Sequence, residues 1–215
     1  MKHFLLLLSF WLALVSGLHA QNNSLHFDGT DDYVKLSVLP LTISFAQGFS
    51  FTAWVKWDAF QGNARLFDFA NGKESSNNLI LRIDNSTGRI AFQSITSSNS
   101  EIITYTEVVS VGKWVHVAVT LYSNSATIYI NGVQVRTGTI NTPYSATRSC
   151  SYLGKSAWDA DKYFKGSMDE VTIWSKALSQ SEVVTAMRGV FSISDDKLMA
   201  YYSCNQGTAN GDNTT

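Results

Sequence analysis

The strongest constraint on the fold is a period-two alternation of apolar and polar residues that recurs along the chain. In FSFTAWVKW, residues 49–57, apolar side chains occupy every second position, beginning with Phe49. In KWVHVAVTLY, residues 113–122, Val115 and every second residue after it up to Leu121 are apolar. Because successive side chains of a strand point to opposite faces, both runs predict strands with one buried face.

Five further runs have strand-like composition. They are ARLFDFA (64–70), NNLILRID (77–84), GRIAFQSI (88–95), EIITYTE (101–107) and DEVTIW (169–174). Short turn signals such as GNA, NSTG and TSSNS separate these runs at close intervals. Many short strands with turns between them favour an antiparallel sandwich over alternating strands and helices. The sequence therefore predicts an all-β fold.

The run TIYINGVQV (127–135) predicts a hairpin. The Asn-Gly pair at its centre supplies the positive φ angles that a two-residue type I′ turn requires. In this register Ile130 faces Val133 and Ile128 faces Val135, which places all four aliphatic side chains on one face.

One helix is predicted, in ALSQSEVVTAMRG (177–189). Ser179 is the expected N-cap, because Glu182 three residues later completes a capping box. Gly189 suits the position after the last turn. The expected apolar stripe consists of Val183, Val184 and Met187. We expect this helix to close one end of the sandwich.

The start of the chain predicts export. A basic start, the apolar run FLLLLSFWLALVSG and small residues near Ala20 are typical of a cleaved signal peptide, residues 1–20. The run is short for a membrane anchor, and no other segment is apolar enough to cross a bilayer. With a formal net charge of -1 over 215 residues, the chain has no general attraction to nucleic acid. We expect a mature protein that is secreted or held at the cell surface.

Export gives the two cysteines, Cys150 and Cys204, a defined chemical context. In an oxidising compartment such a pair is compatible with one disulfide, which would add about 4 kcal/mol of stability in the chain-entropy model. Two buried free thiols are the alternative, since the sequence does not give the distance between them. We expect the disulfide.

Five segments occur in the order found in a known family. LHFDGTDDYVKL, FSFTAWVKW, GKWVHVAVTLY, ATIYINGVQV and GSMDEVTIWSKALSQSEV resemble the laminin-G-like jelly-roll domains of the concanavalin-A-like lectin/glucanase superfamily. The resemblance covers residues 25–190. It implies a two-sheet antiparallel jelly-roll sandwich with one short helix near the C-terminus, often a bound calcium ion, and recognition of a glycan or of a cell-surface or extracellular protein. One sandwich hosts many functions, so the resemblance does not by itself imply catalysis.

The expected jelly-roll domain covers residues 21–195. The tail, residues 196–215, contains YYSCNQGTANGDNTT, which resembles a stretch that leads into a further domain in large secreted bacterial proteins. We expect the chain to be the N-terminal part of a longer, multidomain polypeptide.

The turn FDGTDDY predicts a calcium site. Asp28, Asp31 and Asp32 offer carboxylate oxygens, and Gly29 would let backbone carbonyls turn toward an ion. The family resemblance implies that the segment GSMDEV lies beside this turn and brings Asp169 to it. The predicted ligands are Asp28, Asp32 and Asp169, with Asp31 the least favoured. The alternative is an Asx-type turn with solvated carboxylates.

The sequence carries no pattern for glycoside hydrolysis. Glucanases of this superfamily carry their acid/base pair in a Glu-x-Asp-x-x-Glu pattern on one strand, and this pattern does not occur here. The adjacent residues Asp169 and Glu170 are expected to point to opposite faces of their strand. His26 and His116 occur in no nucleophile or zinc-ligand spacing. We predict a protein without catalytic activity.

A glycan site needs an exposed aromatic ring with polar groups beside it. The loop GKSAWDADKYFKG (154–166) offers this combination, and its predicted ligand-binding residues are Trp158, Asp159, Asp161 and Tyr163. For Trp158, packing into the core is the alternative.

The loop WDAFQGNAR (57–65) is a second candidate for ligand binding. With 13% aromatic residues in the chain, however, most rings must belong to the core. The tryptophans expected in the core, because they lie on strand patterns, are Trp54, Trp57, Trp114 and Trp174.

The resulting hypothesis is a secreted, calcium-stabilised, non-catalytic module that binds carbohydrate or protein, as an adhesin does. Two alternatives remain open at this point. One is an accessory domain of a glycoside hydrolase, and the other is a spacer domain that binds no ligand.

Overall fold

The computed structural model describes residues 23–36, 45–73, 77–97 and 99–205. Within these residues the chain forms thirteen strands and one helix. They are β1 (Leu25–Asp28), β2 (Val34–Lys35), β3 (Phe49–Ala59), β4 (Arg65–Ala70), β5 (Asn78–Ile83), β6 (Ile90–Ile95), β7 (Ser100–Thr104), β8 (Trp114–Tyr122), β9 (Ser125–Ile130), β10 (Val133–Thr139), β11 (Cys150–Leu153), β12 (Lys165–Trp174), α1 (Gln180–Met187) and β13 (Leu198–Tyr202). The predicted signal peptide, residues 1–20, lies outside the described residues. Across the described ranges, no helix is long and apolar enough to cross a membrane.

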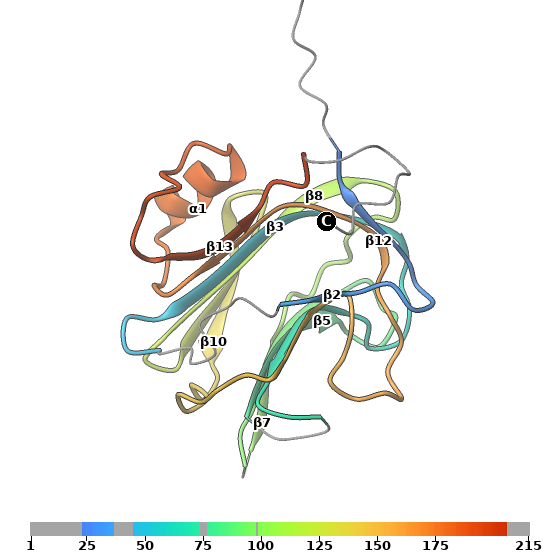
Figure 1. Ribbon diagram of the computed structural model, residues 1–215, viewed down its shortest axis with the longest axis horizontal. Helices are drawn as coiled ribbons and strands as arrows, with labels where there is room; N and C mark the ends of the chain where they lie inside the picture. The colour runs from blue at the N-terminus through green and yellow to red at the C-terminus, as the bar shows by residue number, and fades with distance from the viewer. Residues whose placement is uncertain (1–22, 37–44, 74–76, 98, 206–215) are drawn as a thin grey trace, which may run out of the picture.

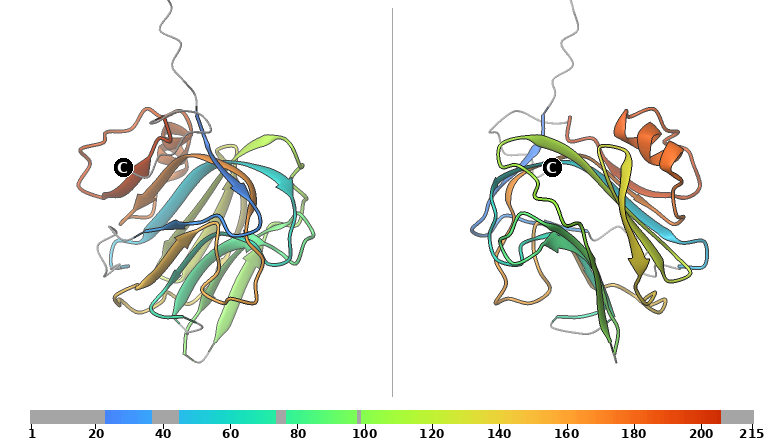
Figure 2. Two further views of the ribbon diagram at one scale, coloured as in Figure 1. Left: turned by 45° about the vertical axis from the view of Figure 1, so that its right-hand side comes forward. Right: turned by 180° about the vertical axis from the view of Figure 1, so that it is seen from behind.

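The strands form two antiparallel sheets that pack face to face (Figures 1 and 2). The first sheet has the order β1-β12-β3-β8-β9-β10, and β13 also pairs with β12. The second sheet has the order β2-β11-β4-β5-β6-β7. The predicted all-β, two-sheet sandwich with one short helix is confirmed. All five runs with strand-like composition contain strands, namely β4, β5, β6, β7 and part of β12, although β7 ends at Thr104 and the last three residues of its run, 105–107, lie outside it.

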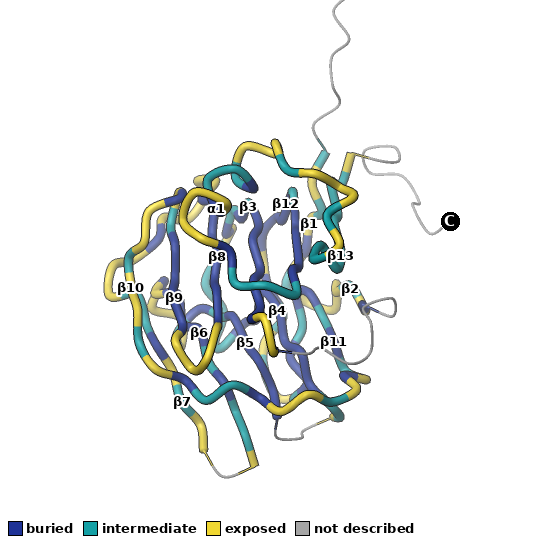
Figure 3. The backbone as a smooth tube through the Cα atoms, turned by 90° about the vertical axis from the view of Figure 1, so that its left-hand side faces the viewer, coloured by how far each residue is buried: buried dark blue, intermediate teal, exposed yellow. Residues whose placement is uncertain are grey.

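The space between the sheets is filled by apolar side chains around a cluster of phenylalanines. Phe67 of β4 lies 4.5 Å from Phe69 and 4.7 Å from Phe51 of β3, measured between ring centroids. Phe49 and Phe92 contact the same cluster, and all five side chains are fully buried. Figure 3 shows that the central strands are buried along most of their length, while the exposed residues gather in turns and at the edges. The alternation in β3 therefore predicts its core-facing side correctly.

The Asn-Gly hairpin forms as predicted at its turn but not along its whole length. Both turn residues have positive φ angles, and Ile130 lies opposite Val133. A β-bulge then places Ile128 opposite Arg136 instead of Val135. The predicted aliphatic face is therefore partly right, because Val135 packs on the core together with Ile128 and Ile130, whereas Val133, next to the turn, is 58% exposed.

Helix α1 has the predicted caps. The Ser179 side chain accepts a hydrogen bond from the Glu182 amide, and the Glu182 carboxylate accepts one from the Ser179 amide. Gly189 follows the last turn with a φ angle of 67°. Of the three predicted stripe residues only Val183 is fully buried, together with Ala186.

The helix packs on the outer face of the first sheet, so the prediction that it closes one end of the sandwich is wrong (Figure 1). Val183 packs against Tyr129 and Trp174, which lie on this outer face. The Trp54 indole nitrogen donates a hydrogen bond to the carbonyl of Met187 at the end of the helix. The apolar face of the helix is therefore buried against side chains on the outer surface of the first sheet, and not against the core at one end of the sandwich.

Both cysteines are free, so the expected disulfide is not formed. Cys150 begins β11 in the second sheet, whereas Cys204 follows β13 at the first sheet. The Cys204 thiol donates a hydrogen bond to the carbonyl of Tyr202. Burial raises the pKa of this thiol to about 11, which keeps it protonated.

Part of the predicted tail belongs to the sandwich. β13 runs antiparallel to β12, from Val171 opposite Tyr202 to Trp174 opposite Leu198. The first sheet therefore includes residues beyond 195, the expected end of the domain.

Phe67→Ala should lower the free energy of unfolding by about 3–5 kcal/mol, because it leaves a cavity among buried rings. As a control, Ile102→Ala truncates a side chain on β7 that is 41% exposed, and it should cost less than about 1 kcal/mol. Denaturant unfolding followed by circular dichroism measures both values. Equal losses in the two variants would contradict the central place of the phenylalanine cluster.

Candidate functional site

The pairing of β1 with β12 positions the acidic turn that follows β1. The two strands are antiparallel, with Leu25 opposite Met168 and Asp28 opposite Lys165. The segments that the family resemblance places together are therefore adjacent. Asp169, however, lies beyond the start of β1, whereas the turn lies beyond its end. The predicted grouping of Asp169 with Asp28 does not occur, because the register separates them by the length of the strand.

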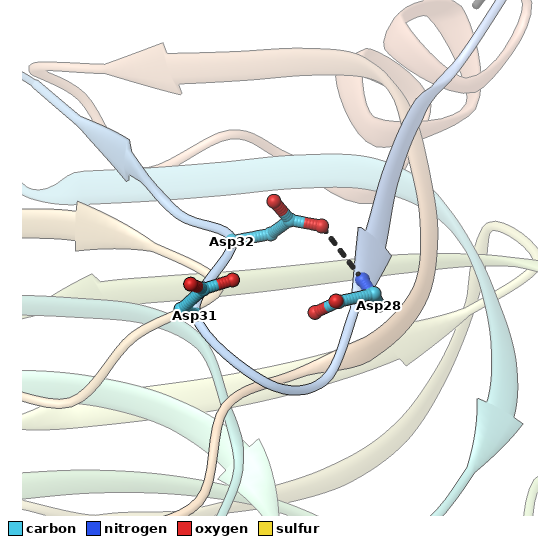
Figure 4. A group of neighbouring side chains, drawn as sticks. All are labelled: Asp28, Asp31 and Asp32. Carbon is cyan, nitrogen blue, oxygen red and sulfur yellow. Dashed lines mark hydrogen bonds between the residues drawn. The ribbon is translucent and has the colours of Figure 1, made fainter.

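Asp28, Asp31 and Asp32 form one group of carboxylates (Figure 4). One oxygen from each side chain lies within 4.8 Å of the others. Asp28 Oδ1 accepts a hydrogen bond from the Thr30 amide at 2.6 Å, and Asp32 Oδ2 accepts one from the Asp28 amide at 2.9 Å. Gly29 has a φ angle of 82°, which lets the chain turn sharply between them. The Asx turn is therefore present, and Asp31, the least favoured candidate, belongs to the group.

The donor set of this group fits a calcium ion. Calcium prefers six to eight oxygen ligands from carboxylates, carbonyls and water, and the three exposed side chains leave room for water. The hydrogen bond from the Thr30 amide holds the pKa of Asp28 below its usual range, so this carboxylate stays charged. The hydrogen bonds of the turn engage one oxygen of Asp28 and one of Asp32, and each carboxylate has a second oxygen. The Asx turn and a calcium site are thus compatible.

Next to the acidic turn, three tyrosines surround one lysine. The Tyr33 ring lies 5.6 Å from the Tyr152 ring and 6.4 Å from the Tyr163 ring, measured between centroids. Lys155 Nζ lies between 4.8 and 5.6 Å from all three centroids. We call these four residues the tyrosine cluster. It joins the acidic turn to the loop 154–166, two candidate segments that are far apart in the sequence.

The two predicted ligand carboxylates of this loop are paired with cations of the chain itself. Asp161 forms an ion pair with Arg65 at 2.8 Å, and Asp159 forms one with Lys73. Arg65 is buried, and its Nε lies 3.7 Å from the carboxylate of the buried Asp68. These contacts hold the loop against the second sheet. The structure therefore gives Asp161 an anchoring role, whereas the pair of Asp159 with Lys73 is exposed on both sides and adds little stability, so ligand binding by Asp159 stays a prediction.

Asp68 lies at the centre of this network. Its carboxylate accepts hydrogen bonds from the Ala157 amide and from the Asn78 side chain, each at 3.0 Å. Burial raises the pKa of Asp68, while the Ala157 amide and Arg65 oppose the rise. The Arg65 guanidinium also lies 5.9 Å from the Trp158 ring centroid. The arginine of the second candidate loop is thus a structural residue.

Two of the four tryptophans that the strand patterns assign to the core are partly exposed. Trp57 and Trp174 are buried as predicted. Trp54 is half-buried and Trp114 is 41% exposed, so the prediction is wrong for both. The sequence already indicated the exposure of Trp114, because the alternation that directs Val115 into the core directs the preceding residue, Trp114, to the outer face.

A bulge in β12 brings two adjacent carboxylates to one face. Glu170 has a φ angle of 49°, and the register with β3 shifts after Asp169. Both carboxylates line a pocket of about 590 Å³ on the outer face of the first sheet, together with Trp54 and Trp114. We call it the outer pocket. The prediction that Asp169 and Glu170 point to opposite faces is wrong, because it assumed a regular strand.

The two described histidines have structural surroundings. His116 is buried 5.5 Å from the Trp54 ring, and burial lowers its pKa to about 4. Among the described residues, neither of its ring nitrogens has a hydrogen-bond partner. His26 is exposed, with Nδ1 3.3 Å from Ser167 Oγ and 3.8 Å from the Asp58 carboxylate. Ser167 and Asp58 both approach the same nitrogen of His26, whereas a catalytic triad uses one ring nitrogen for the serine and the other for the carboxylate. Among the described residues, neither histidine belongs to a group of three metal-ligating side chains.

Sequence comparison matches most of the chain to one family model. The model describes the concanavalin A-like lectin/glucanases superfamily, and it matches residues 28–184. No curated protein matches the chain.

Several solved structures share the fold. A candidate carbohydrate-binding protein from Bacteroides ovatus superposes with a TM-score of 0.66 at 20% identity, over 86% of this chain and 52% of its own. Domain 4 of an extracellular GH43 arabinanase from Geobacillus stearothermophilus, solved with arabinotriose, has a TM-score of 0.56 at 25% identity, over 66% of each chain. The CBM40 of the Ruminococcus gnavus IT-sialidase, bound to α2,3-sialyllactose, has a TM-score of 0.64 at 14% identity, over 76% of this chain and 95% of its own. This chain spans about half the length of the Bacteroides ovatus protein and 66% of the arabinanase domain.

Asp169→Asn should raise thermal stability near pH 7.5 but have little effect near pH 4. Burial raises the pKa of the Asp169 carboxyl from 3.8 to about 6, so above this pH the folded state holds a charge that it disfavours. This loss of folding stability becomes smaller as the pH drops through 6. It is absent below pH 3.8, where the Asp169 carboxyl is protonated in both the folded and the unfolded chain. At about 1.4 kcal/mol per pKa unit, it amounts to at most about 3 kcal/mol.

Thermal unfolding of the wild type and the variant across this pH range measures the difference. His116 destabilises both proteins as the pH falls from 6.5 toward 4, because its folded-state pKa is lowered, and this effect cancels in the comparison. A difference in stability that does not change with pH would contradict the assignment to Asp169.

Proposed function

Because the chain belongs to the concanavalin A-like lectin/glucanase superfamily, we propose that it is a secreted, non-catalytic module that binds carbohydrate. The arabinanase domain solved with arabinotriose and the CBM40 bound to sialyllactose support this class of ligand. The site is argued from the residues of this chain.

The observation that carries the proposal is the meeting of the acidic turn with the loop 154–166 in the tyrosine cluster. Tyr33 is 45% exposed, and its ring lies beside that of Tyr163. Exposed aromatic rings pack against the apolar faces of sugars, while polar groups nearby bond to the hydroxyls. The tyrosines supply the rings, and Lys155 and the acidic turn supply the polar groups. Trp158, half-buried in the same loop, stays a predicted ligand-binding residue, and its ring lies 5.9 Å from the Arg65 guanidinium.

We propose that a calcium ion is held by Asp28, Asp31 and Asp32. The ion would neutralise three neighbouring carboxylates and so order the turn that carries Tyr33. Its role is therefore to fix the position of an aromatic ring, and sugar hydroxyls would meet a rigid surface. Asp169, a predicted ligand, is not included, because β1 separates it from the turn.

We assign no catalytic role to the chain. Hydrolysis of a glycoside by two carboxylates requires that they flank the scissile bond. In the outer pocket Glu170 accepts a hydrogen bond from the Tyr201 hydroxyl at 2.5 Å, and Asp169 accepts one from the Glu170 amide at 2.8 Å. Both carboxylates come from adjacent positions of one strand, which does not place them across a substrate from each other.

We propose that the module acts outside the cell, on the basis of the signal-peptide pattern in residues 1–20. The likeness to domain 4 of an arabinanase favours a second candidate, an accessory domain that brings a glycoside hydrolase to its substrate. In both cases the chain itself contributes binding.

The mature chain should bind a sugar on a glycan array that includes arabinotriose and α2,3-sialyllactose, probed in the presence of calcium. Tyr33→Ala should weaken that binding roughly tenfold, because it removes an exposed ring from the site. Tyr122→Ala is the matched control, since this tyrosine is 53% exposed at the far end of β8. Binding that survives Tyr33→Ala unchanged would rule out the tyrosine cluster, and a blank array would argue for the spacer hypothesis.

Calcium should raise the unfolding temperature of the mature chain relative to a chelator. At a concentration near one hundred times the dissociation constant, an ion that binds only the folded state adds about 2.7 kcal/mol. Asp28→Asn keeps an oxygen that can accept from the Thr30 amide but loses the charge, so it should preserve the turn and lose the calcium response. Asp169→Asn should keep the response. Loss of the response in Asp169→Asn would return that residue to the site.

A further inference from the structure

The outer pocket lies where two strands meet along one edge of β12. β1 pairs with the first part of β12 up to Met168, and β13 pairs with its last part from Val171 onward. Asp169 and Glu170 lie between these two pairings, and Tyr201 of β13 lines the pocket beside them. The pocket is therefore a product of the topology and not of one flexible loop.

The two carboxylates are held in place by hydrogen bonds. The left-handed φ angle of Glu170, which residues other than glycine rarely adopt, turns its side chain to the same face as Asp169. The Tyr201 hydroxyl donates to one Glu170 oxygen, and the Glu170 amide donates to one Asp169 oxygen. Asp169 is only 7% exposed. The pocket thus contains two carboxylates in fixed positions that can accept further hydrogen bonds and that do not pack in the core between the sheets.

Two tryptophans and two cations complete the lining. Trp54 is fixed against the end of α1 by the hydrogen bond from its indole nitrogen to the Met187 carbonyl. Trp114 is 41% exposed, and Lys56 Nζ lies 5.6 Å from its ring centroid. Arg188, the C-cap residue of α1, lines the same pocket. An exposed indole ring therefore lies beside both anionic and cationic hydrogen-bonding groups.

We propose that the outer pocket binds a neutral saccharide that packs on Trp114 and bonds through its hydroxyls to Asp169 and Glu170. Sugar hydroxyls can donate to carboxylates and accept from the ammonium of Lys56 and the guanidinium of Arg188, while the C–H face of the sugar packs on the indole. The volume of about 590 Å³ lies within the range of small-molecule sites.

Other ligand classes fit this lining less well. An apolar molecule would strip water from four charged groups without replacing their hydrogen bonds. The two carboxylates would repel a phosphate, and Lys56 and Arg188 would repel an organic ammonium ion. With two charges of each sign, the lining has no net charge to attract an ion, which leaves a neutral polyhydroxylated molecule as the best match.

This inference rests on the proposed function only for the class of ligand. The outer pocket and the tyrosine cluster share no residue, and they lie beyond opposite ends of β1. Binding at one surface can therefore be tested while the other is removed.

The test is a titration of the ¹⁵N-labelled mature chain, followed by the indole N–H signals of its tryptophans. The probes are arabinotriose, xylotriose, cellotriose and mannotriose, with α2,3-sialyllactose as the charged comparison. At least one neutral probe should shift the Trp54 and Trp114 signals in a saturable way. The signals of Trp57 and Trp174, which are buried, should move little.

Three variants locate the binding. Trp114→Ala should weaken binding roughly tenfold, because it removes the exposed ring. Glu170→Gln keeps an oxygen that can accept from Tyr201 and loses the charge, so it should weaken binding without unfolding the protein. Tyr33→Ala, which removes a ring from the tyrosine cluster, should leave the titration of the outer pocket unchanged. Unfolding temperatures of all three establish that they are folded.

The outcomes separate this inference from the proposed function. Loss of binding in Trp114→Ala and Glu170→Gln, with Tyr33→Ala unaffected, supports the outer pocket whether or not the tyrosine cluster binds sugar. No saturable shift of the Trp114 signal with any neutral probe overturns it. Loss only in Tyr33→Ala also overturns it and places binding at the tyrosine cluster. Release of reducing sugar from a probe would overturn the assignment of the two carboxylates to binding.

Discussion

β12 is the strand on which both candidate surfaces depend. One edge pairs with β3, while the other pairs with β1 along its first part and with β13 along its last part. The pairing with β1 sets the acidic turn beside the loop that carries Tyr163. The junction with β13 leaves Asp169 and Glu170 to bulge toward the outer face. This strand edge, shared by segments from the two ends of the described chain, therefore positions the acidic turn and the outer pocket, while the pairing of β2 with β11 in the second sheet brings Tyr33 to Tyr152.

Charged residues in this protein have two roles that look alike in the sequence. Asp161, Arg65 and Asp68 form a mostly buried network that anchors the loop 154–166 to the second sheet. Removing one partner of such a network leaves an uncompensated buried charge, which is strongly destabilising. The network also fixes the loop that carries Tyr163, and a ring held in place before binding loses less conformational freedom when a ligand arrives. In the proposed function, the anchoring charges would therefore contribute to binding indirectly.

The tyrosine cluster and the outer pocket are built from different residues and are held by different contacts. β1 has four residues, so the two surfaces lie beyond opposite ends of a strand roughly 13 Å long. An ion at the acidic turn would order Tyr33 directly. The carboxylates of the outer pocket are instead held by Tyr201 and by the backbone of the bulge. Calcium and the outer pocket are therefore expected to act on separate parts of the module.

The sequence by itself determined nine of the thirteen described strands (β3 to β10 and β12), the Asn-Gly turn and the helix caps, because each depends on residues that are close along the chain. It also identified the two segments, the acidic turn and the loop 154–166, that meet in the tyrosine cluster. Only the tertiary structure decided that Asp31 and not Asp169 completes the acidic group. Only the tertiary structure decided that Cys150 and Cys204 stay apart, in different sheets. These outcomes depend on strand register and on a bulge, and a shift of one residue in either changes which face a side chain takes and which residues it meets.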